Sequence, residues 1–323
     1  MRRPGGGPGA AARHAEGWTA EDGCVTWMVD ADGVLLRVRH WPRRGSGGRG
    51  WGGCGTPVLL AHGTGFTAAT WNGVAERLRA GRDVFAYDRR GHGASDKPAG
   101  RLTIEDFAAD VPLLCRALGL RRCLGVGHSA GATDLLLASL RHPDLFAGLL
   151  LHEPTIASAD ARPADGPFPA PIADRLDRLT RRRGAFPSKD AALEQYAARP
   201  LFAAWRRDLL RAYVDTGFEE VDGEARLLCT PELEREITGN IAHAMDDRDP
   251  GDGTFRRLAE LVTPYALARS VASESIFGTM AQRLTASAPP LWKVRFECGH
   301  CAPMERPDAF ADAVLRLAAG IGA

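Results

Sequence analysis

The sequence predicts an α/β protein in which helices cover a mostly parallel central sheet and an inserted helical segment interrupts the core. Three observations carry this expectation. Short apolar runs alternate with amphipathic segments from about residue 57 to residue 151. The alternation then stops, and only helical patterns follow up to about residue 245. It resumes near residue 255, so one core domain with an insertion fits a chain of 323 residues.

The first part of the core opens with a hairpin. Two short runs, Cys24 to Val29 and Val34 to Trp41, flank the turn Asp30-Ala31-Asp32-Gly33. Continuous apolar runs, typical of strands buried on both faces of a parallel sheet, follow at Pro57 to Ala61, Asp83 to Tyr87, Cys123 to Val126 and Leu145 to Leu151. Helices are expected between them over Ala69 to Ala80, Ile104 to Leu118 and Gly131 to Arg141.

The inserted segment shows no strand pattern. Its amphipathic runs predict helices over Ile172 to Arg183, Lys189 to Ala198, Ala203 to Asp215 and Pro231 to Ala244. The core then continues with a helix at Phe255 to Leu261, a strand at Tyr265 to Ala268, a helix at Gly278 to Ala286, a strand at Leu291 to Phe296 and a helix at Pro307 to Leu317. We therefore expect a flexible leader over 1–17, a core over 18–153 and 246–323, and a helical cap over 154–245.

The composition excludes several classes of protein. A formal net charge of +1, with short basic runs among acids, argues against a nucleic-acid partner. No run reaches the roughly 18 apolar residues of a membrane span. The first residues carry an Arg pair without a following apolar stretch, so no signal peptide is expected. The seven cysteines are an odd, scattered set that favours reduced thiols. We expect a cytoplasmic protein, a monomer or homodimer, with no membrane partner.

The segment Gly127-His128-Ser129-Ala130-Gly131 carries the predicted nucleophile. It joins an apolar strand to a helix, which is the context of a nucleophile elbow. The sharp turn needs small residues beside the serine and places its oxygen at the helix N-terminus. Ser129 is therefore the predicted nucleophile, and the Ala130 amide is a predicted donor to an oxyanion.

A second glycine-rich turn, His62-Gly63-Thr64-Gly65-Phe66, ends an earlier strand. It is expected to supply the other oxyanion donor, from the Thr64 amide or alternatively from that of Phe66. His62 is expected to be structural. His300 follows the last strand and so lies on a loop at the carboxyl edge of the sheet, where parallel folds gather reactive groups. It is the predicted general base.

The two turns, the segment 88–98 (DRRGHGASDKP) and the segment 299–307 (GHCAPMERP) resemble successive signatures of the α/β-hydrolase family, in its capped branch. That branch contains esterases, carbon-carbon bond hydrolases, epoxide hydrolases and haloalkane dehalogenases. The resemblance implies an eight-stranded sheet, a helical cap over the active site and no cofactor. Epoxide hydrolases and dehalogenases carry aspartate at the elbow, so Ser129 disfavours those two activities.

The resemblance also implies an acid on the loop after the penultimate strand, to hold the imidazole. The carboxylate in reach of that strand is Glu274, which we expect to complete the triad. Glu153, after the strand Leu145 to Leu151, is the alternate acid. Cys298 and Cys301 have the spacing of a metal or redox pair, but the sequence offers no further ligands at suitable spacing, and no metal is expected.

The expected function is cleavage of an ester, thioester or lactone of a small to medium molecule through an acyl-enzyme. Two alternatives stay open: a carbon-carbon bond hydrolase of the same fold, and a non-catalytic relative that binds a small molecule. His128, Phe66 and Trp205 are expected to contact the substrate. Other large side chains of the cap are expected to line the pocket or pack the cap itself: Phe168, Tyr196, Phe202 and Tyr213.

Overall fold

The computed structural model describes residues 23–45, 55–156, 170–244 and 256–323. The predicted leader over 1–17 and Phe168 lie outside the described residues. The central sheet has eight strands in the order β1-β2-β4-β3-β5-β6-β10-β11. β2 pairs antiparallel with β1 and β4, whereas all the other neighbours are parallel. The expected mostly parallel sheet is therefore confirmed.

The strands of this sheet lie where the apolar runs predict them, within one or two residues at most ends. They are β1 (Val25–Asp30), β2 (Leu35–Trp41), β3 (Val58–Ala61), β4 (Val84–Tyr87), β5 (Cys123–His128), β6 (Phe146–His152), β10 (Tyr265–Ser270) and β11 (Trp292–Phe296). Every residue of β3, β4 and β5 is buried. That full burial explains why these strands show continuous apolar runs instead of alternation.

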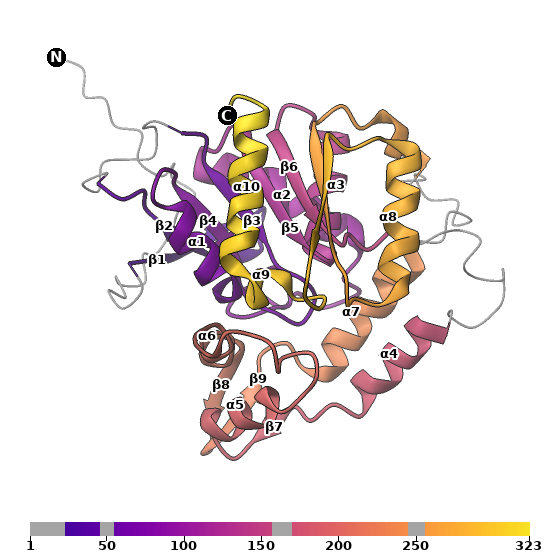
Figure 1. Cartoon of the computed structure of the whole chain (residues 1–323). Coiled ribbons are helices and arrows are strands. Elements are labelled where there is room, and N and C mark those ends of the chain that lie inside the picture. Colours follow the sequence, from indigo (N-terminus) through magenta and orange to yellow (C-terminus); the bar gives the residue numbers. More distant parts are fainter. Residues whose placement is uncertain (1–22, 46–54, 157–169, 245–255) are drawn as a thin grey trace.

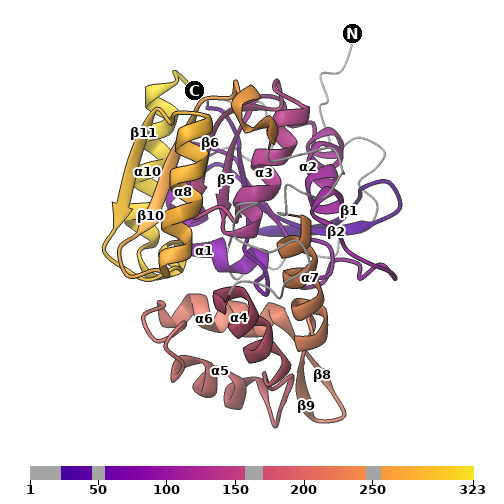
Figure 2. The same ribbon diagram turned by 90° about the vertical axis from the view of Figure 1, so that its right-hand side faces the viewer.

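Helices cover both faces of the sheet (Figures 1 and 2). One face is covered by α1 (Asn72–Leu78) and α10 (Pro307–Gly320), and the other by α2 (Ile104–Leu118), α3 (Ala130–Arg141) and α8 (Ser275–Ser287). Each face has its own buried apolar cluster. The short elements η2 (Ala68–Trp71), η4 (Arg256–Glu260) and α9 (Ala302–Glu305) complete the core.

Local capping explains why one helix matches its predicted bounds. Thr103 accepts a hydrogen bond from the Asp106 amide, and Asp106 accepts one from the Thr103 amide, which is a capping box at the start of α2. Gly119 ends the helix with a φ of 67°, a left-handed conformation that glycine adopts without strain. The helix expected over Ala69 to Ala80 instead begins as the 3-10 turn η2 and ends at Leu78.

Residues 170–244, between β6 and η4, form the cap, which lies below the core in Figure 1. Its helices are α4 (Ala170–Thr180), α5 (Lys189–Ala197), α6 (Arg207–Gly217) and α7 (Pro231–Ala244). The expectation of helices alone is wrong. The cap also holds a three-stranded antiparallel sheet in the order β7-β9-β8, made of β7 (Ala185–Phe186), β8 (Phe218–Val221) and β9 (Glu224–Leu227).

A tight turn closes the hairpin of β8 and β9. Both turn residues have positive φ angles, 53° at Asp222 and 80° at Gly223. Asp-Gly is a favoured pair for such a turn because both positions need the left-handed region. This dipeptide was therefore the sequence signal that the helical interpretation overlooked.

Aromatic side chains join the cap to the core. The Phe66 ring, from the loop after β3, lies 5.3 Å from the Trp205 ring and 5.8 Å from the Tyr213 ring between centroids. These residues belong to one buried cluster with Phe202 and Met304. Aromatic contacts of this kind fix the cap above the carboxyl edge of the sheet. Within the described ranges, no helix has the length and apolar character that crossing a bilayer requires.

Candidate active site

Ser129 occupies a strained turn between β5 and α3. Its φ of 54° and ψ of −124° are unusual for a residue with a side chain. The glycines on either side leave no room for a methyl group. A Cβ at Gly131 would lie 2.4 Å from the Ala61 carbonyl oxygen, and one at Gly127 would lie 2.3 Å from the Ala132 Cα. This geometry is that of a nucleophile elbow, with Ser129 at the N-terminus of a helix.

Glu153 follows the neighbouring strand β6 and contacts His300. The carboxylate is fully buried, and its Oε2 lies 2.6 Å from Nδ1 of His300. Its other oxygen accepts hydrogen bonds from the Ser270 amide at 2.9 Å and from the Ser273 hydroxyl. The backbone of Glu153 has a positive φ of 46°, so a second strained residue stands beside the elbow. A buried carboxylate with these partners can hold the imidazole in one orientation.

The order expected for the two acids is therefore corrected. Glu274 is the N-cap residue of α8, its side chain is 62% exposed, and its nearest cationic partner is Arg178 at 3.9 Å. The chain after β10 stays beside β11, because the Val271 amide donates to the Phe296 carbonyl at 2.9 Å. Within the described residues no hydrogen bond joins Glu274 to His300, and the position at Nδ1 is already taken by Glu153.

His300 is held by contacts of both its ring and its backbone. It stacks on Phe277 with centroids 4.2 Å apart, and its backbone carbonyl accepts a hydrogen bond from His128 Nε2 at 2.9 Å. Burial, followed by the positive charge of Arg175, lowers the pKa of His300 to about 3. The Glu153 contact acts in the opposite direction, because a bonded carboxylate stabilises imidazolium. A lowered pKa keeps His300 neutral near pH 7, the form that can accept a proton.

The predicted oxyanion donors lie next to Ser129. Thr64 and Ala130 line the same pocket as the serine. The Ala130 amide is the first of α3, and the first four amides of a helix have no acceptor within that helix. The alternate donor, Phe66, is engaged elsewhere because its amide donates to the Gly63 carbonyl at 3.2 Å. Tyr213 of the cap donates to the Gly65 carbonyl at 3.0 Å and so anchors this loop.

His62 has the contacts of a structural histidine. Its Nδ1 lies 2.8 Å from the Gly63 carbonyl oxygen, and its Nε2 accepts from the Arg89 amide at 3.0 Å. Burial lowers its pKa well below the usual value. Both ring nitrogens are therefore used within the protein, and His62 holds the loop after β3 to the loop after β4.

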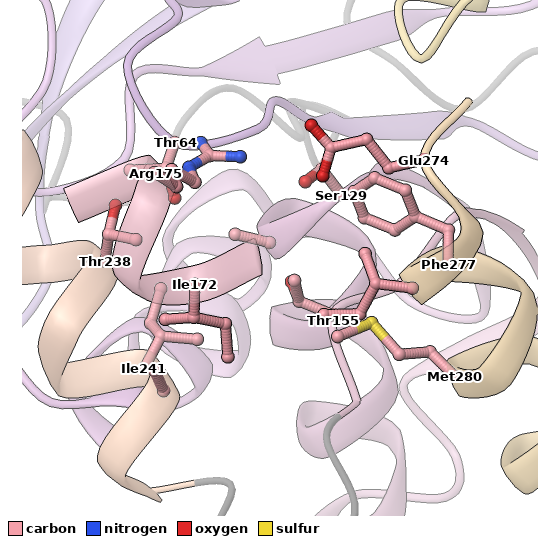
Figure 3. A pocket seen from close by; sticks show the side chains of 13 residues that line it. Thr64, Ser129, Thr155, Ile172, Arg175, Thr238, Ile241, Glu274, Phe277 and Met280 are labelled. Atoms are coloured by element: carbon pink, nitrogen blue, oxygen red, sulfur yellow. The ribbon is translucent and has the colours of Figure 1, made fainter. Parts of the chain in front are cut away.

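A cavity opens beside Ser129 between the core and the cap (Figure 3). It is lined by Thr64, Ser129, Ala130, Thr155, Ile172, Arg175, Thr238, Ile241, Ala242, Glu274, Ile276, Phe277 and Met280. The lining residues come from both parts of the core and from two cap helices, α4 and α7.

The expected substrate contacts are not among these lining residues. His128 is buried under Phe66 and His300, and Phe66 and Trp205 pack in the aromatic cluster that joins cap to core. Sequence patterns do not distinguish a large side chain that packs from one that lines a cavity. They also gave no signal for Arg175, which lies on an amphipathic helix where arginines usually face solvent.

Cys298 and Cys301 are buried free thiols. The Cys298 thiol lies 3.6 Å from the Ser270 hydroxyl, and burial raises the pKa of both thiols. Within the described residues, no group of three or more His, Cys, Asp or Glu side chains could hold a metal ion.

Comparisons with known proteins show the family of this chain. Residues 58–313 match the model of the Alpha/beta hydrolase family, so the chain belongs to that family. A similar curated protein is 2-(acetamidomethylene)succinate hydrolase of Mesorhizobium japonicum, 28% identical over 216 residues, or 65% of this chain and 68% of that protein. Another is a non-heme chloroperoxidase of Streptomyces lividans, 40% identical over 109 residues, which cover 33% of this chain and only 36% of that protein.

Solved structures share the fold over nearly the whole chain. The crystal structure of E-2-(acetamidomethylene)succinate hydrolase superposes with a TM-score of 0.74 at 21% identity, covering 91% of this chain and 98% of that one. The thioesterase domain from the curacin biosynthetic pathway gives 0.70 at 18% identity, covering 91% and 99%. Because the sequence identities are this low, the superpositions establish a shared fold and nothing more.

Proposed function

We propose that this protein is a serine hydrolase that cleaves an ester, thioester or lactone through an acyl-enzyme. The observation that carries the proposal is the contact of 2.6 Å between Glu153 Oε2 and His300 Nδ1, beside a serine held at a strained elbow. A buried carboxylate bonded to a neutral imidazole and a serine on the wall of a cavity are the parts that nucleophilic acyl transfer requires.

The mechanism follows from these roles. His300 takes the hydroxyl proton of Ser129 as Oγ attacks the carbonyl carbon, and the amides of Thr64 and Ala130 hold the oxyanion. Collapse of this intermediate breaks the bond to the leaving group, which takes the proton from His300. Water, deprotonated in turn by His300, then attacks the acyl-enzyme and releases the acid and the free serine. Each oxyanion donor contributes about 3 kcal/mol to such a step.

The test uses purified protein and 4-nitrophenyl butyrate, without added metal. We expect hydrolysis that Ser129→Ala reduces by about 10⁴-fold or more, since triad members act as a unit. A fluorophosphonate probe should label Ser129 in the wild type and leave the alanine variant unlabelled. Labelling is the sharper measurement because it requires an activated serine whatever the natural substrate is.

The same experiment separates the alternatives. A folded wild type that resists the probe contradicts the proposal and favours the non-catalytic ligand-binding relative. A labelled protein that cleaves vinylogous 1,5-diketones at least 100 times faster, in kcat/KM, than any ester or thioester tested favours the carbon-carbon bond hydrolase. Hydrolysis retained in Ser129→Ala contradicts the nucleophile assignment.

A further inference from the structure

The cavity beside Ser129 contains a cation that has no acidic partner among the described residues. Arg175 on α4 lines the cavity and is half-buried. Two nearby arginines are paired, since Arg178 lies 3.9 Å from Glu274 and Arg182 forms an ion pair with Glu234. No acidic group in the part of the chain that the structure describes pairs with Arg175. Partly buried guanidinium groups are usually paired, so Arg175 gives the cavity a binding group for an anion.

The guanidinium lies close to the reacting groups. In Figure 3 the Arg175 side chain points to the side of the cavity where Thr64 and Ser129 lie. The positive charge of Arg175 also helps to lower the pKa values of His300 and His128. An anion held by Arg175 would therefore belong to the molecule whose carbonyl faces Ser129.

A second donor lies on the same side. The Thr238 hydroxyl of α7 is buried without a hydrogen-bond partner in the described residues, and in Figure 3 it points toward Arg175. The remaining walls are mainly apolar, with side chains from Ile172, Ile241, Ala242, Ile276, Phe277 and Met280. A guanidinium and a hydroxyl above an apolar wall suit one carboxylate on a short hydrocarbon body.

We propose that the substrate carries a carboxylate and that Arg175 of the cap binds it, which makes Arg175 a specificity-determining residue. The inference rests on the serine hydrolase function proposed above. Glu274 lines the same cavity but is mostly exposed and lies near Arg178, so its charge is screened by solvent and by that neighbour. The site therefore accepts one anion near Arg175.

The test compares two esters that differ by one charge, 4-nitrophenyl hemisuccinate and methyl 4-nitrophenyl succinate, after subtraction of the uncatalysed rates. We expect the wild type to prefer the anionic ester in kcat/KM. Arg175→Gln should lower kcat/KM for the anionic ester by about 10- to 100-fold, mainly through KM, and change that for the neutral ester only a few-fold. Arg175→Lys should retain part of the preference for the anionic ester. Thr238→Val should weaken this preference less than Arg175→Gln does.

The matched control is Arg178→Gln, one turn further along α4, which should keep the preference. A second pair, 4-acetoxybenzoate and its methyl ester, places the charge on the leaving group and tells which side of the scissile bond faces Arg175. The inference is overturned if neither pair shows a preference in the wild type, or if Arg175→Gln lowers both members of a pair equally.

Failure of the proposed function gives a different result. In that case no ester of either pair is hydrolysed and the probe does not label Ser129. Binding of succinate, followed by isothermal titration calorimetry on the wild type and on Arg175→Gln, then tests the anion site by itself. Equal binding by the two proteins contradicts the role of Arg175 whatever the catalytic result.

Discussion

Glu153 and His300 are 147 residues apart in the chain, yet a hydrogen bond of 2.6 Å joins their side chains. The contact exists because β6 and β11 both border β10, so that loops from these strands meet at one edge of the sheet. Two further donors, the Ser270 amide and the Ser273 hydroxyl, hold the carboxylate from the end of β10. The Glu153 carboxylate, which follows β6, is thus positioned by residues that follow β10 and β11.

We predict that Glu153→Gln lowers kcat by at least about 10²-fold, and by up to roughly 10⁴-fold, because an amide cannot fix the tautomer of His300 or stabilise its protonated form. Steady-state hydrolysis of 4-nitrophenyl butyrate measures the effect. The matched control is Glu274→Gln, which should leave kcat nearly unchanged since that carboxylate is exposed. If both variants fold, as circular dichroism would show, and Glu274→Gln has the larger effect, the acid assignment is wrong.

The close approach of backbone at the elbow gives a second prediction. A methyl group at Gly131 would meet the Ala61 and His62 carbonyl oxygens at 2.4 and 2.5 Å, and neither backbone atom can move without displacing β3 or the loop that follows it. Gly131→Ala should therefore cost about 1–3 kcal/mol or more of stability and lower kcat at least 10-fold. Urea unfolding and ester hydrolysis measure the two effects.

Gly239 on α7 provides the control, because a methyl group there would lie 4.0 Å from its nearest neighbour, Leu176. Gly239→Ala should be neutral or stabilise the protein by about 0.5–1 kcal/mol, as expected for glycine replaced by alanine within a helix. Equal losses in the two variants would show that Gly131 is not a special position.

The shifted pKa of His300 predicts the pH dependence of catalysis. The base must be neutral to act, and burial and Arg175 lower its pKa, so kcat/KM should keep its plateau below the usual histidine value of about 6.5. Arg175→Gln removes a positive charge that opposes protonation, which should raise the pKa and move the acidic limb to higher pH. The neutral ester is the substrate for this profile. An unchanged limb in Arg175→Gln would contradict the electrostatic coupling.

Local sequence context was sufficient to single out Ser129 and His300 as the proposed nucleophile and base. Ser129 lies in a turn whose glycines are required by contacts with adjacent backbone, and His300 follows a strand that the apolar pattern shows. The acid could not be chosen this way. Glu153 and Glu274 both follow predicted strands, and the choice depends on the positive φ of Glu153 and on donors from β10, which are tertiary facts.

The pocket was still harder to predict than the acid. Whether Phe66 and Trp205 pack or line the cavity depends on how the cap sits on the core, and no periodicity in the sequence encodes that placement. The cap hairpin is different, since the Asp222-Gly223 pair was visible as a turn signal. Reading it as a turn would have predicted β8 and β9.

Finally, buried histidine makes stability depend on pH. His92 is fully buried, and burial, followed by the positive charge of Arg89, lowers its pKa to about 3. In the unfolded chain histidine takes up a proton near pH 6.5, so below that value the unfolded state binds more protons than the folded state. The stabilising contribution of His92 to the free energy of unfolding is therefore present above about pH 6.5 and is lost as the pH falls toward 3. Between pH 7 and pH 5.5 the loss amounts to about 1 kcal/mol.

We predict that His92→Gln, which cannot titrate, loses about 1 kcal/mol less stability than the wild type between pH 7 and pH 5.5. Urea unfolding at the two pH values measures the free energy of unfolding of each protein. Comparing its change between the two pH values cancels any effect of the substitution that does not depend on pH. His142→Gln is the control because that side chain is exposed, and it should follow the wild type. If His92→Gln lost as much stability as the wild type over this interval, the buried imidazole would not be the neutral group that its surroundings require.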